Sequence, residues 1–205
     1  MDKLTHVTIK NPFQDQKPGT SGLRKSTLKF QEPHYLEIFV ESVLLQINNL
    51  EGNTIIVGGD GRYGNKKAIQ KIIQICAAHN VGKIIITKDG ILSTPAASNL
   101  IRKRKAHLGI ILSASHNPGG VDGDFGIKVN ISNGGPAPEK LTNQIYSCSQ
   151  SLLDYKFYDY PVQDFEKEGS FKIKDMIVEI IDGVEEYVAL MEKIFDLDQI
   201  GDYLQ

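Results

Sequence analysis

The chain has 205 residues, a formal net charge of −2 and a hydrophobic content of 40%. This length suits one sizeable domain, or one domain with part of a second, and the near-neutral charge argues against nucleic acid or an anionic membrane surface as a partner. Cys76 and Cys148 lie outside any CxxC or histidine-rich context, which argues against disulfide scaffolds and zinc sites. No apolar stretch reaches membrane-spanning length and no signal peptide precedes the chain, so we expect a cytoplasmic protein.

The first part of the chain alternates predicted strands and helices. Residues 4–10 alternate in polarity as a strand does, and residues 33–48 place apolar side chains at helical spacing, with a proline at the helix start. Residues 54–57 form a short β-branched strand that ends in a glycine turn. Residues 65–79 predict a second helix, with Cys76 on its buried face.

The rest of the chain continues the alternation. The predicted elements are strand 83–87 ended by Asp89-Gly90, a helix capped by Ser93 or Thr94, strands 108–112 and 125–131, helix 138–152, an irregular surface segment 155–170, strand 171–181, a helix from Asp182 to Phe195 and a further helix beginning at 196. Such an alternation predicts an α/β fold, a three-layer α/β sandwich with a mixed, mostly parallel sheet.

Four glycine-containing loops stand out, at residues 18–24, 58–62, 113–120 and 133–136. Open α/β sheets bind ligands at the carboxyl ends of their strands, and glycine-rich turns let backbone N–H groups approach an anion. We therefore expect the four loops to meet at one sheet edge. There they would hold an anionic ligand, most naturally a phosphorylated one.

Two of these loops carry side chains that could face a ligand. In the first, the hydroxyls of Thr20 and Ser21 and the guanidinium of Arg24 could hold an anion together, although an exposed hairpin explains the same residues equally well. In the second, Asp60 and Arg62 could form a pair that faces a ligand, or serve only as a cap and its partner.

The loop after strand 108–112 concentrates the most chemistry. It places the hydroxyl of Ser115, the imidazole of His116 and the amide of Asn117 beside a proline and two glycines, and Lys128 follows in the next strand. A nucleophile at a strand end with a basic residue from the neighbouring strand is typical of an active-site loop, whereas the alternative is a plain surface turn. Because the G-x-S-x-G elbow is absent, Ser115 and His116 do not form a hydrolase pair.

Six motifs, in the same order along the chain, resemble a known family, the eukaryotic-type α-phosphoglucomutases. This family belongs to the phosphohexomutase superfamily, which includes the parafusin-like proteins. The resemblance is to the N-terminal domain only and runs from about Lys10 onward. The motifs are KPGTSGLRK (17–25), VGGDGR (57–62), GILSTPA (90–96), SASHNPGG (113–120), DFGIKVNISNGGPAP (124–138) and VEIID (178–182).

The resemblance implies a function and roles for individual residues. Its members interconvert glucose 1-phosphate and glucose 6-phosphate through a phosphoserine and Mg²⁺, with glucose 1,6-bisphosphate as intermediate and activator. The resemblance implies that Ser115 carries the transferable phosphate and contacts the metal through it, and that His116 and Asn117 shape the loop. It implies that Lys128 is a general acid/base or a charge partner of the phosphate. It also implies that Thr20, Ser21 and Arg24 bind the substrate or the phosphoserine.

The chain also departs from the family, whose members are much longer and have four domains. The family's aspartate-rich metal loop, sugar-discriminating loop and C-terminal phosphate-binding loop lie in later domains and have no counterpart here. Since Mg²⁺ needs several hard oxygen ligands, one phosphoserine cannot hold it. We therefore expect the 205 residues alone to be inactive, with residues 1–190 forming the first domain and residues 191–205 the start of a second. The choice between glucose and mannose stays open.

Two interpretations of different class remain. The chain is either the N-terminal piece of a phosphoglucomutase, which the stop inside a predicted helix favours, or a natively short, non-catalytic scaffold protein within a larger assembly. Both imply that an apolar face is covered by the remaining mutase domains or by a protein partner.

Overall fold

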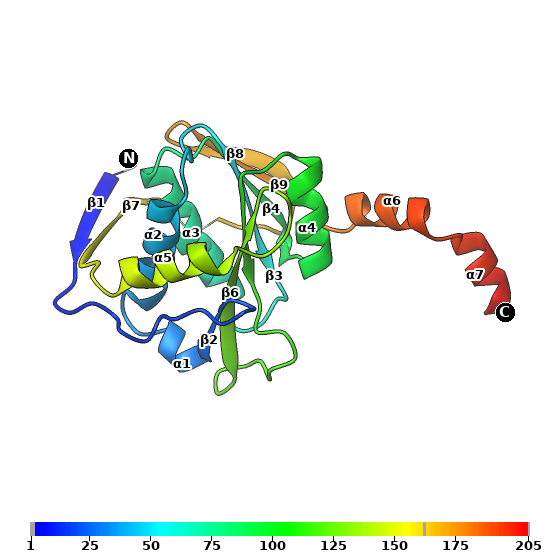
Figure 1. Ribbon diagram of the computed structural model, residues 1–205. Coiled ribbons are helices and arrows are strands. Elements are labelled where there is room, and N and C mark those ends of the chain that lie inside the picture. The colour runs from blue at the N-terminus through cyan, green and yellow to red at the C-terminus, as the bar shows by residue number, and fades with distance from the viewer. Residues whose placement is uncertain (1–2, 162, 205) are drawn as a thin grey trace.

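The computed structural model describes residues 3–161 and 163–204, and it has three layers (Figure 1). A seven-stranded sheet lies between helices on its two faces. The sheet order is β2 (Leu23–Ser26), β6 (Asp124–Ile131), β5 (Leu108–Leu112), β3 (Thr54–Gly59), β4 (Lys83–Ile91), β9 (Met176–Ile181) and β8 (Gly169–Ile173).

Strand direction divides this sheet into a centre and two edges. The four central strands β5, β3, β4 and β9 are parallel to their neighbours in that group. The edge pairs β2–β6, β6–β5 and β9–β8 are antiparallel. The predicted α/β sandwich with a mixed sheet is therefore confirmed, and its parallel part is the centre.

The central strands are apolar at nearly every position because helices cover both faces of the sheet. Side chains alternate along a strand, so Ile55 and Val57 of β3 pack in the large core cluster on one face, whereas Ile56 packs in the smaller cluster on the other. All three are fully buried. The two clusters form the two halves of the hydrophobic core.

The short helix α1 was not predicted, and the other helices agree with the predicted spans to within a few residues. Pro33 lies two residues before helix α2 (Tyr35–Gln46), whose N-cap is His34 with a φ of 70°. None of the helices within 3–161 and 163–204 is long and apolar enough to cross a membrane. The helices are α1 (Thr27–Phe30), α2 (Tyr35–Gln46), α3 (Asn65–Ala78), α4 (Thr94–Lys103), α5 (Glu139–Ser149), α6 (Glu185–Ile194) and α7 (Leu197–Tyr203).

Helix α4 begins at a side-chain cap. The hydroxyl of Ser93 accepts a hydrogen bond from the N–H of Ala96, and Pro95 occupies the first turn. We expect Ser93→Ala to lower the free energy of unfolding by about 1 kcal/mol, because one N–H at the helix start loses its partner. Chemical denaturation of both proteins measures this change. Thr94→Ala is the control and should cost less than about 0.5 kcal/mol; equal losses would contradict a capping role for Ser93.

The prediction of an irregular surface segment over 155–170 is wrong at both ends, since its last two residues belong to β8, and Phe165 within it is buried. Residues 154–159 form strand β7 (Asp154–Asp159), which pairs antiparallel with β1 (Lys3–Thr8) in a separate two-stranded sheet. Aromatic residues on both faces of β7 conceal the alternation: Tyr155 is buried and contacts His34, while Phe157 and Tyr158 pack partly against the core. A strand that is half-apolar on both faces has no clear period of two.

The predicted strand 171–181 is two strands. β8 and β9 form a hairpin whose turn contains Lys174 at a φ of 52°, a conformation that usually favours glycine or asparagine. The turn lacks those residues, so the sequence does not signal it. Asp89 and Gly90 do not end β4 either, since the strand runs on to Ile91 past an irregularity.

The C-terminal segment leaves the body of the molecule (Figure 1). Helix α6 is tied to α4 by Glu186, which pairs with Arg104 and accepts a hydrogen bond at its carbonyl from Asn99. Asp182 accepts from the N–H groups of Val184 and Glu185, so it fixes the turn before α6 while Val184 is the N-cap residue. The apolar side chains exposed along the last turn of α6 and along α7 are Ile194, Phe195, Leu197, Ile200, Tyr203 and Leu204.

Candidate functional site

Ser115 lies in the loop that follows the buried strand β5, at the carboxyl end of the parallel strands. Its φ of 60° is unusual for a non-glycine residue, and the residue is exposed. The hydroxyl of Ser113, itself buried, accepts a hydrogen bond of 3.0 Å from the backbone N–H of Ser115. The strand therefore ends in a backbone turn that presents Ser115 to solvent. The sequence analysis did not predict this role of Ser113.

Asp60 and Arg62 hold this loop from the end of β3. The Arg62 guanidinium forms a fork on the Asp60 carboxylate, with Nη2 at 2.8 Å and Nε at 2.9 Å from its oxygens. Arg62 also donates to the carbonyl of Asp124 at 2.7 Å and to the carbonyl of Ser115 at 3.3 Å. The Arg62 side chain is only 7% exposed. Asp60 and Arg62 thus bond to each other, and Arg62 holds the Ser115 loop in place. The prediction of a ligand-facing pair or of a cap and its partner did not include this role.

The carboxyl of Asp60 is held in its charged form. Partial burial would raise its pKa, but the hydrogen bonds from Arg62 and Ser113 outweigh burial, and the pKa lies below its ordinary value. Asp60 is therefore ionised at neutral pH and balances the charge of Arg62.

Asn117 and His116 occupy the same loop in different ways. The Asn117 side chain donates to the Asp124 carboxylate at 2.7 Å, which links the loop to the start of β6. His116 is exposed, and within residues 3–161 and 163–204 its imidazole makes no hydrogen bond or ion pair. Asn117 therefore shapes the loop, whereas His116 stays available to a ligand.

Arg24 comes from the edge strand β2, and Lys128 comes from the neighbouring strand β6. Arg24 on β2 pairs with Gly126 of β6, two residues from Lys128. Burial and the charge of Arg24 lower the pKa of Lys128, and Arg62 adds to this while Asp60 opposes it. Lys128 thus lies within electrostatic reach of Arg24, Arg62 and Asp60, and three cationic side chains gather near the Ser115 loop.

This electrostatic coupling can be tested directly. We expect Arg24→Gln to raise the pKa of Lys128, since the ammonium form loses a repulsive neighbour, and Asp60→Asn to lower it further. A pH titration of the Lys128 side-chain carbon resonance measures both changes. Lys66, which pairs with Asp89, is the internal control and should titrate alike in all three proteins. A Lys128 pKa unchanged in Arg24→Gln would contradict the coupling.

Thr20 and Ser21 line a cavity of ≈ 500 Å³ beside Lys128. The adjoining Gly22 has a φ of 91°, and a Cβ there would collide with the carbonyl of Ile127, so the turn lies directly on β6. Both hydroxyl residues are exposed. The turn thus brings two hydroxyls to the same lysine that Arg24 influences.

The expectation that all four glycine loops meet at one edge is wrong. Loops 58–62 and 113–120 do meet, at the carboxyl ends of β3 and β5. Loop 133–136 lies at the opposite end, because β6 is antiparallel to β5 and pairs Ile131 with Leu108. The last two residues of the predicted loop 18–24 belong to β2, and residues 18–22 lie along β6 and share the cavity of Lys128 with loop 133–136.

The arrangement can stabilise the charge of a phosphoryl group on Ser115, since phosphoryl transfer depends mainly on positioning and on neutralising the equatorial oxygens. A metal is a different matter. The described part of the chain contains no group of three or more His, Cys, Asp or Glu side chains that could hold a metal ion. These residues by themselves do not fit Mg²⁺.

Comparison with known proteins finds relatives over most of the chain. Residues 15–156 match the family model of phosphoglucomutase/phosphomannomutase, alpha/beta/alpha domain I. The phosphoglucomutase of Rhizobium radiobacter is 54% identical over 194 residues, which are 94% of this chain and 36% of that protein. Phosphoglucomutase-1 of Bos taurus is 48% identical over 210 residues, covering 97% and 37%.

A solved structure shows the same similarity. The exocytosis-sensitive phosphoprotein parafusin, a phosphoglucomutase of Paramecium, in its open form superposes with a TM-score of 0.90 at 39% identity. The match covers 95% of this chain and 37% of the parafusin chain. This chain therefore spans about a third of the length of the relatives that it matches.

Proposed function

Because this chain belongs to the phosphoglucomutase/phosphomannomutase family through its alpha/beta/alpha domain I, we propose that it supplies the phosphoserine domain of a phosphoglucomutase. The proposed enzyme interconverts glucose 1-phosphate and glucose 6-phosphate. The observation that carries the proposal is the exposed hydroxyl-bearing loop of Ser115, held by Arg62 and placed beside the cations Arg24 and Lys128.

In the proposed reaction, phosphorylated Ser115 donates its phosphoryl group to the free hydroxyl of a bound sugar monophosphate. The bond between phosphorus and the serine Oγ breaks, a new bond to the sugar oxygen forms, and the hydroxyl proton leaves to a base. The resulting bisphosphate then returns its other phosphoryl group to Ser115, and its sugar oxygen takes up a proton. The phosphate has thereby moved between O1 and O6 of glucose.

The chain's own residues have distinct proposed roles. Lys128 acts as general acid/base or as a charge partner of the phosphate, and its lowered pKa brings it closer to working pH. Arg24, Thr20 and Ser21 bind the phosphate of the substrate or of Ser115, which suits the bidentate donor of arginine. Asn117 shapes the loop around Ser115 through its bond to Asp124, and the exposed imidazole of His116 contacts the phosphoryl group.

The proposal also covers what this part of the protein does not contain. Mg²⁺ would neutralise phosphate charge, but it needs oxygen ligands beyond those that the described residues bring together. Glucose 1,6-bisphosphate is the proposed intermediate and activator. We therefore propose that residues 1–190 are the first domain, that residues 191–205 begin a second, and that the 205 residues alone are inactive.

The partners follow from the same reasoning. The apolar side chains exposed on α7 suit a surface that the remaining mutase domains cover. Sugar phosphates are charged and do not cross membranes unaided, so we propose that the protein acts in the cytoplasm. The alternative of a non-catalytic scaffold is not favoured, since the relatives described above are named phosphoglucomutases.

A fusion protein tests the proposal. These 205 residues replace the matching part of the Rhizobium radiobacter phosphoglucomutase, and a coupled assay follows the conversion of glucose 1-phosphate to glucose 6-phosphate. We expect turnover, with phosphate on Ser115 after incubation with glucose 1,6-bisphosphate. A fusion that is folded by circular dichroism but takes up no phosphate on Ser115 would refute the proposed function.

A further inference from the structure

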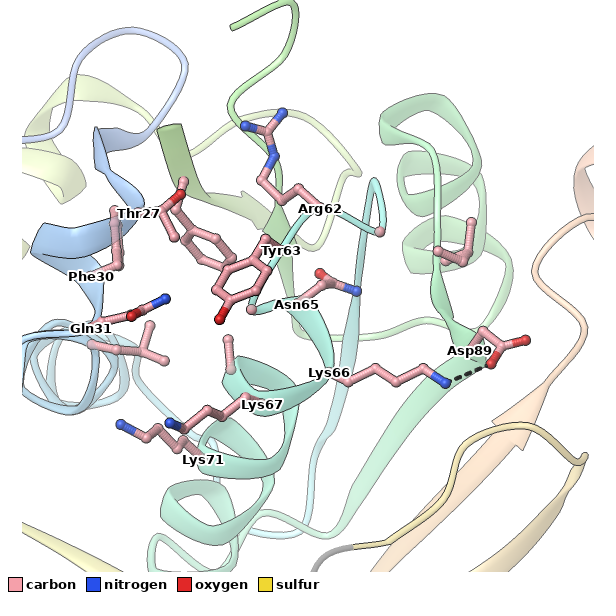
Figure 2. Close-up of a pocket in the computed structure, with 16 residues that line it drawn as sticks. Thr27, Phe30, Gln31, Arg62, Tyr63, Asn65, Lys66, Lys67, Lys71 and Asp89 are labelled. Atoms are coloured by element: carbon pink, nitrogen blue, oxygen red, sulfur yellow. Dashed lines mark hydrogen bonds and ion pairs between the residues drawn. The ribbon is translucent and has the colours of Figure 1, made fainter. Parts of the chain in front are cut away.

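A second cavity, of ≈ 510 Å³, lies between α1 and the first turns of α3 (Figure 2). Its lining residues include neither Ser115, His116 nor Lys128. Arg62 contributes to one wall, but its guanidinium is turned away from the cavity toward Asp60 and the Ser115 loop. The volume falls in the range of cavities that bind small molecules. This cavity is therefore separate from the proposed phosphoryl-transfer site.

The body of the cavity is apolar. Phe30 of α1 and Phe125 of β6 lie against each other with ring centroids 4.9 Å apart, and Leu36 and Ala68 add aliphatic surface. Tyr63 extends its ring into the same space from the loop before α3 (Figure 2). Flat aromatic groups pack well against such ring faces and edges.

One end of the cavity is polar and positively charged. Figure 2 shows the polar ends of Gln31, Tyr63, Lys67 and Lys71 on the same side of the cavity, whereas Lys66 extends the other way. Helix α3 also begins here without a side-chain cap, so its positive dipole end adds to the field.

The ion pairs determine how much of this charge is uncompensated. The Lys66 ammonium is 2.8 Å from the Asp89 carboxylate, and the Lys71 ammonium is 2.5 Å from the carboxylate of Glu37. In the described part of the chain, Lys67 makes no hydrogen bond or ion pair. The cavity thus offers one unneutralised ammonium next to an aromatic wall.

One buried hydroxyl at this cavity has no hydrogen-bond partner among the described residues. Thr27 lines it, is 2% exposed, and its Oγ1 has no hydrogen-bond partner within the described residues. Buried polar groups without a partner are uncommon and call for a missing water or ligand atom.

From these observations we propose that the cavity is a binding site for a small aromatic molecule that carries one anionic group. The ring system packs among Phe30, Phe125 and Tyr63, and the anion pairs with the Lys67 ammonium. Neither sugar phosphates nor inorganic phosphate fits this description, because they lack the apolar group that the walls would bury.

Naphthalene-1-sulfonate is the probe for this site. It is titrated into the 15N-labelled 205-residue chain, and backbone amide shifts report where it binds. We expect shifts over residues 27–31 and 61–71 and none over residues 113–117. The uncharged analogue 1-naphthalenemethanol should bind the same residues about fivefold more weakly, because it cannot pair with Lys67.

Two matched lysine variants separate a specific contact from general attraction. Lys67→Gln should weaken binding of naphthalene-1-sulfonate about fivefold, whereas Lys66→Gln should change it by less than about twofold, since that ammonium faces Asp89. Ala68→Leu, which fills the apolar space, should remove the amide shifts over 27–31. Both lysines are exposed, so their variants should fold.

Three results would overturn the proposal. Shifts confined to residues 113–120 would place the probe in the phosphoryl-transfer site. Equal weakening by Lys66→Gln and Lys67→Gln would reduce the effect to general charge attraction. Absence of shifts up to millimolar probe in the folded chain would show that the cavity binds no such ligand. None of these results bears on phosphate transfer at Ser115.

Discussion

Replacing Ser115 by alanine in the fusion protein is expected to lower turnover about a thousandfold or more. On the proposed mechanism the serine oxygen carries the phosphoryl group in every cycle, and loss of a covalent nucleophile removes the route rather than slowing one step. The coupled assay measures the loss. Phosphate mapping after incubation with glucose 1,6-bisphosphate should find no label in the loop 113–120.

Ser132 provides the matched control. It is an exposed serine at the opposite end of β6 from the Ser115 loop. Ser132→Ala should keep turnover within about twofold of the parent fusion. If Ser115→Ala retained substantial turnover, or if phosphate mapped to another serine, the assignment of Ser115 would be wrong while the family membership would stand.

Arg62→Ala is expected to produce the second large effect, on both stability and activity. The change leaves the Asp60 carboxylate without its fork and leaves the carbonyls of Asp124 and Ser115 without their donor. Breaking a fully buried pair costs about 3–5 kcal/mol, and because the Asp60 side chain is 32% exposed we expect a loss of about 2–3 kcal/mol. Denaturation in urea measures the loss.

Displacement of the Ser115 loop should also lower turnover of the fusion protein by about a hundredfold, since small misplacements of reacting groups are costly. Arg62→Lys should restore little of the unfolding free energy or of the turnover, because an ammonium cannot form the bidentate contact with Asp60. Lys66→Gln, which breaks the exposed pair with Asp89, is the control and should cost less than about 0.5 kcal/mol. Equal losses in Arg62→Ala and Lys66→Gln would contradict the positioning role.

The Asp60–Arg62 pair also has a pH signature. The pKa of Asp60 is lower in the folded state than its ordinary value in the unfolded chain. The pair therefore stabilises the fold fully at pH values above that ordinary pKa. The contribution is lost as the pH falls through the lowered pKa. The unfolding free energy of the parent should therefore decline more steeply in acid than that of Arg62→Ala, and parallel curves would argue against the pair.

Local patterns were sufficient for most of the elements and for the choice of the central loop. The β-branched run of β3 and the apolar run of β5 predicted strands, and Ser93 or Thr94 before Pro95 predicted the start of α4. The motif around Ser115 indicated a nucleophile at a strand end. These features depend on side-chain periodicity and on the backbone preferences of proline and glycine, which act over a few neighbouring residues.

The tertiary structure decided which of these pieces meet. The antiparallel entry of β6 carries loop 133–136 away from Ser115, and the pairing of β2 with β6 brings Arg24 to Lys128. The contacts of Arg62 with Asp124 and Ser115 join residues more than 50 positions apart. Strand order and direction follow from the burial of whole faces and from long-range pairing, which no local window of the sequence contains. The sequence by itself thus determined the chemistry of the loops, and the fold determined which of them form one site.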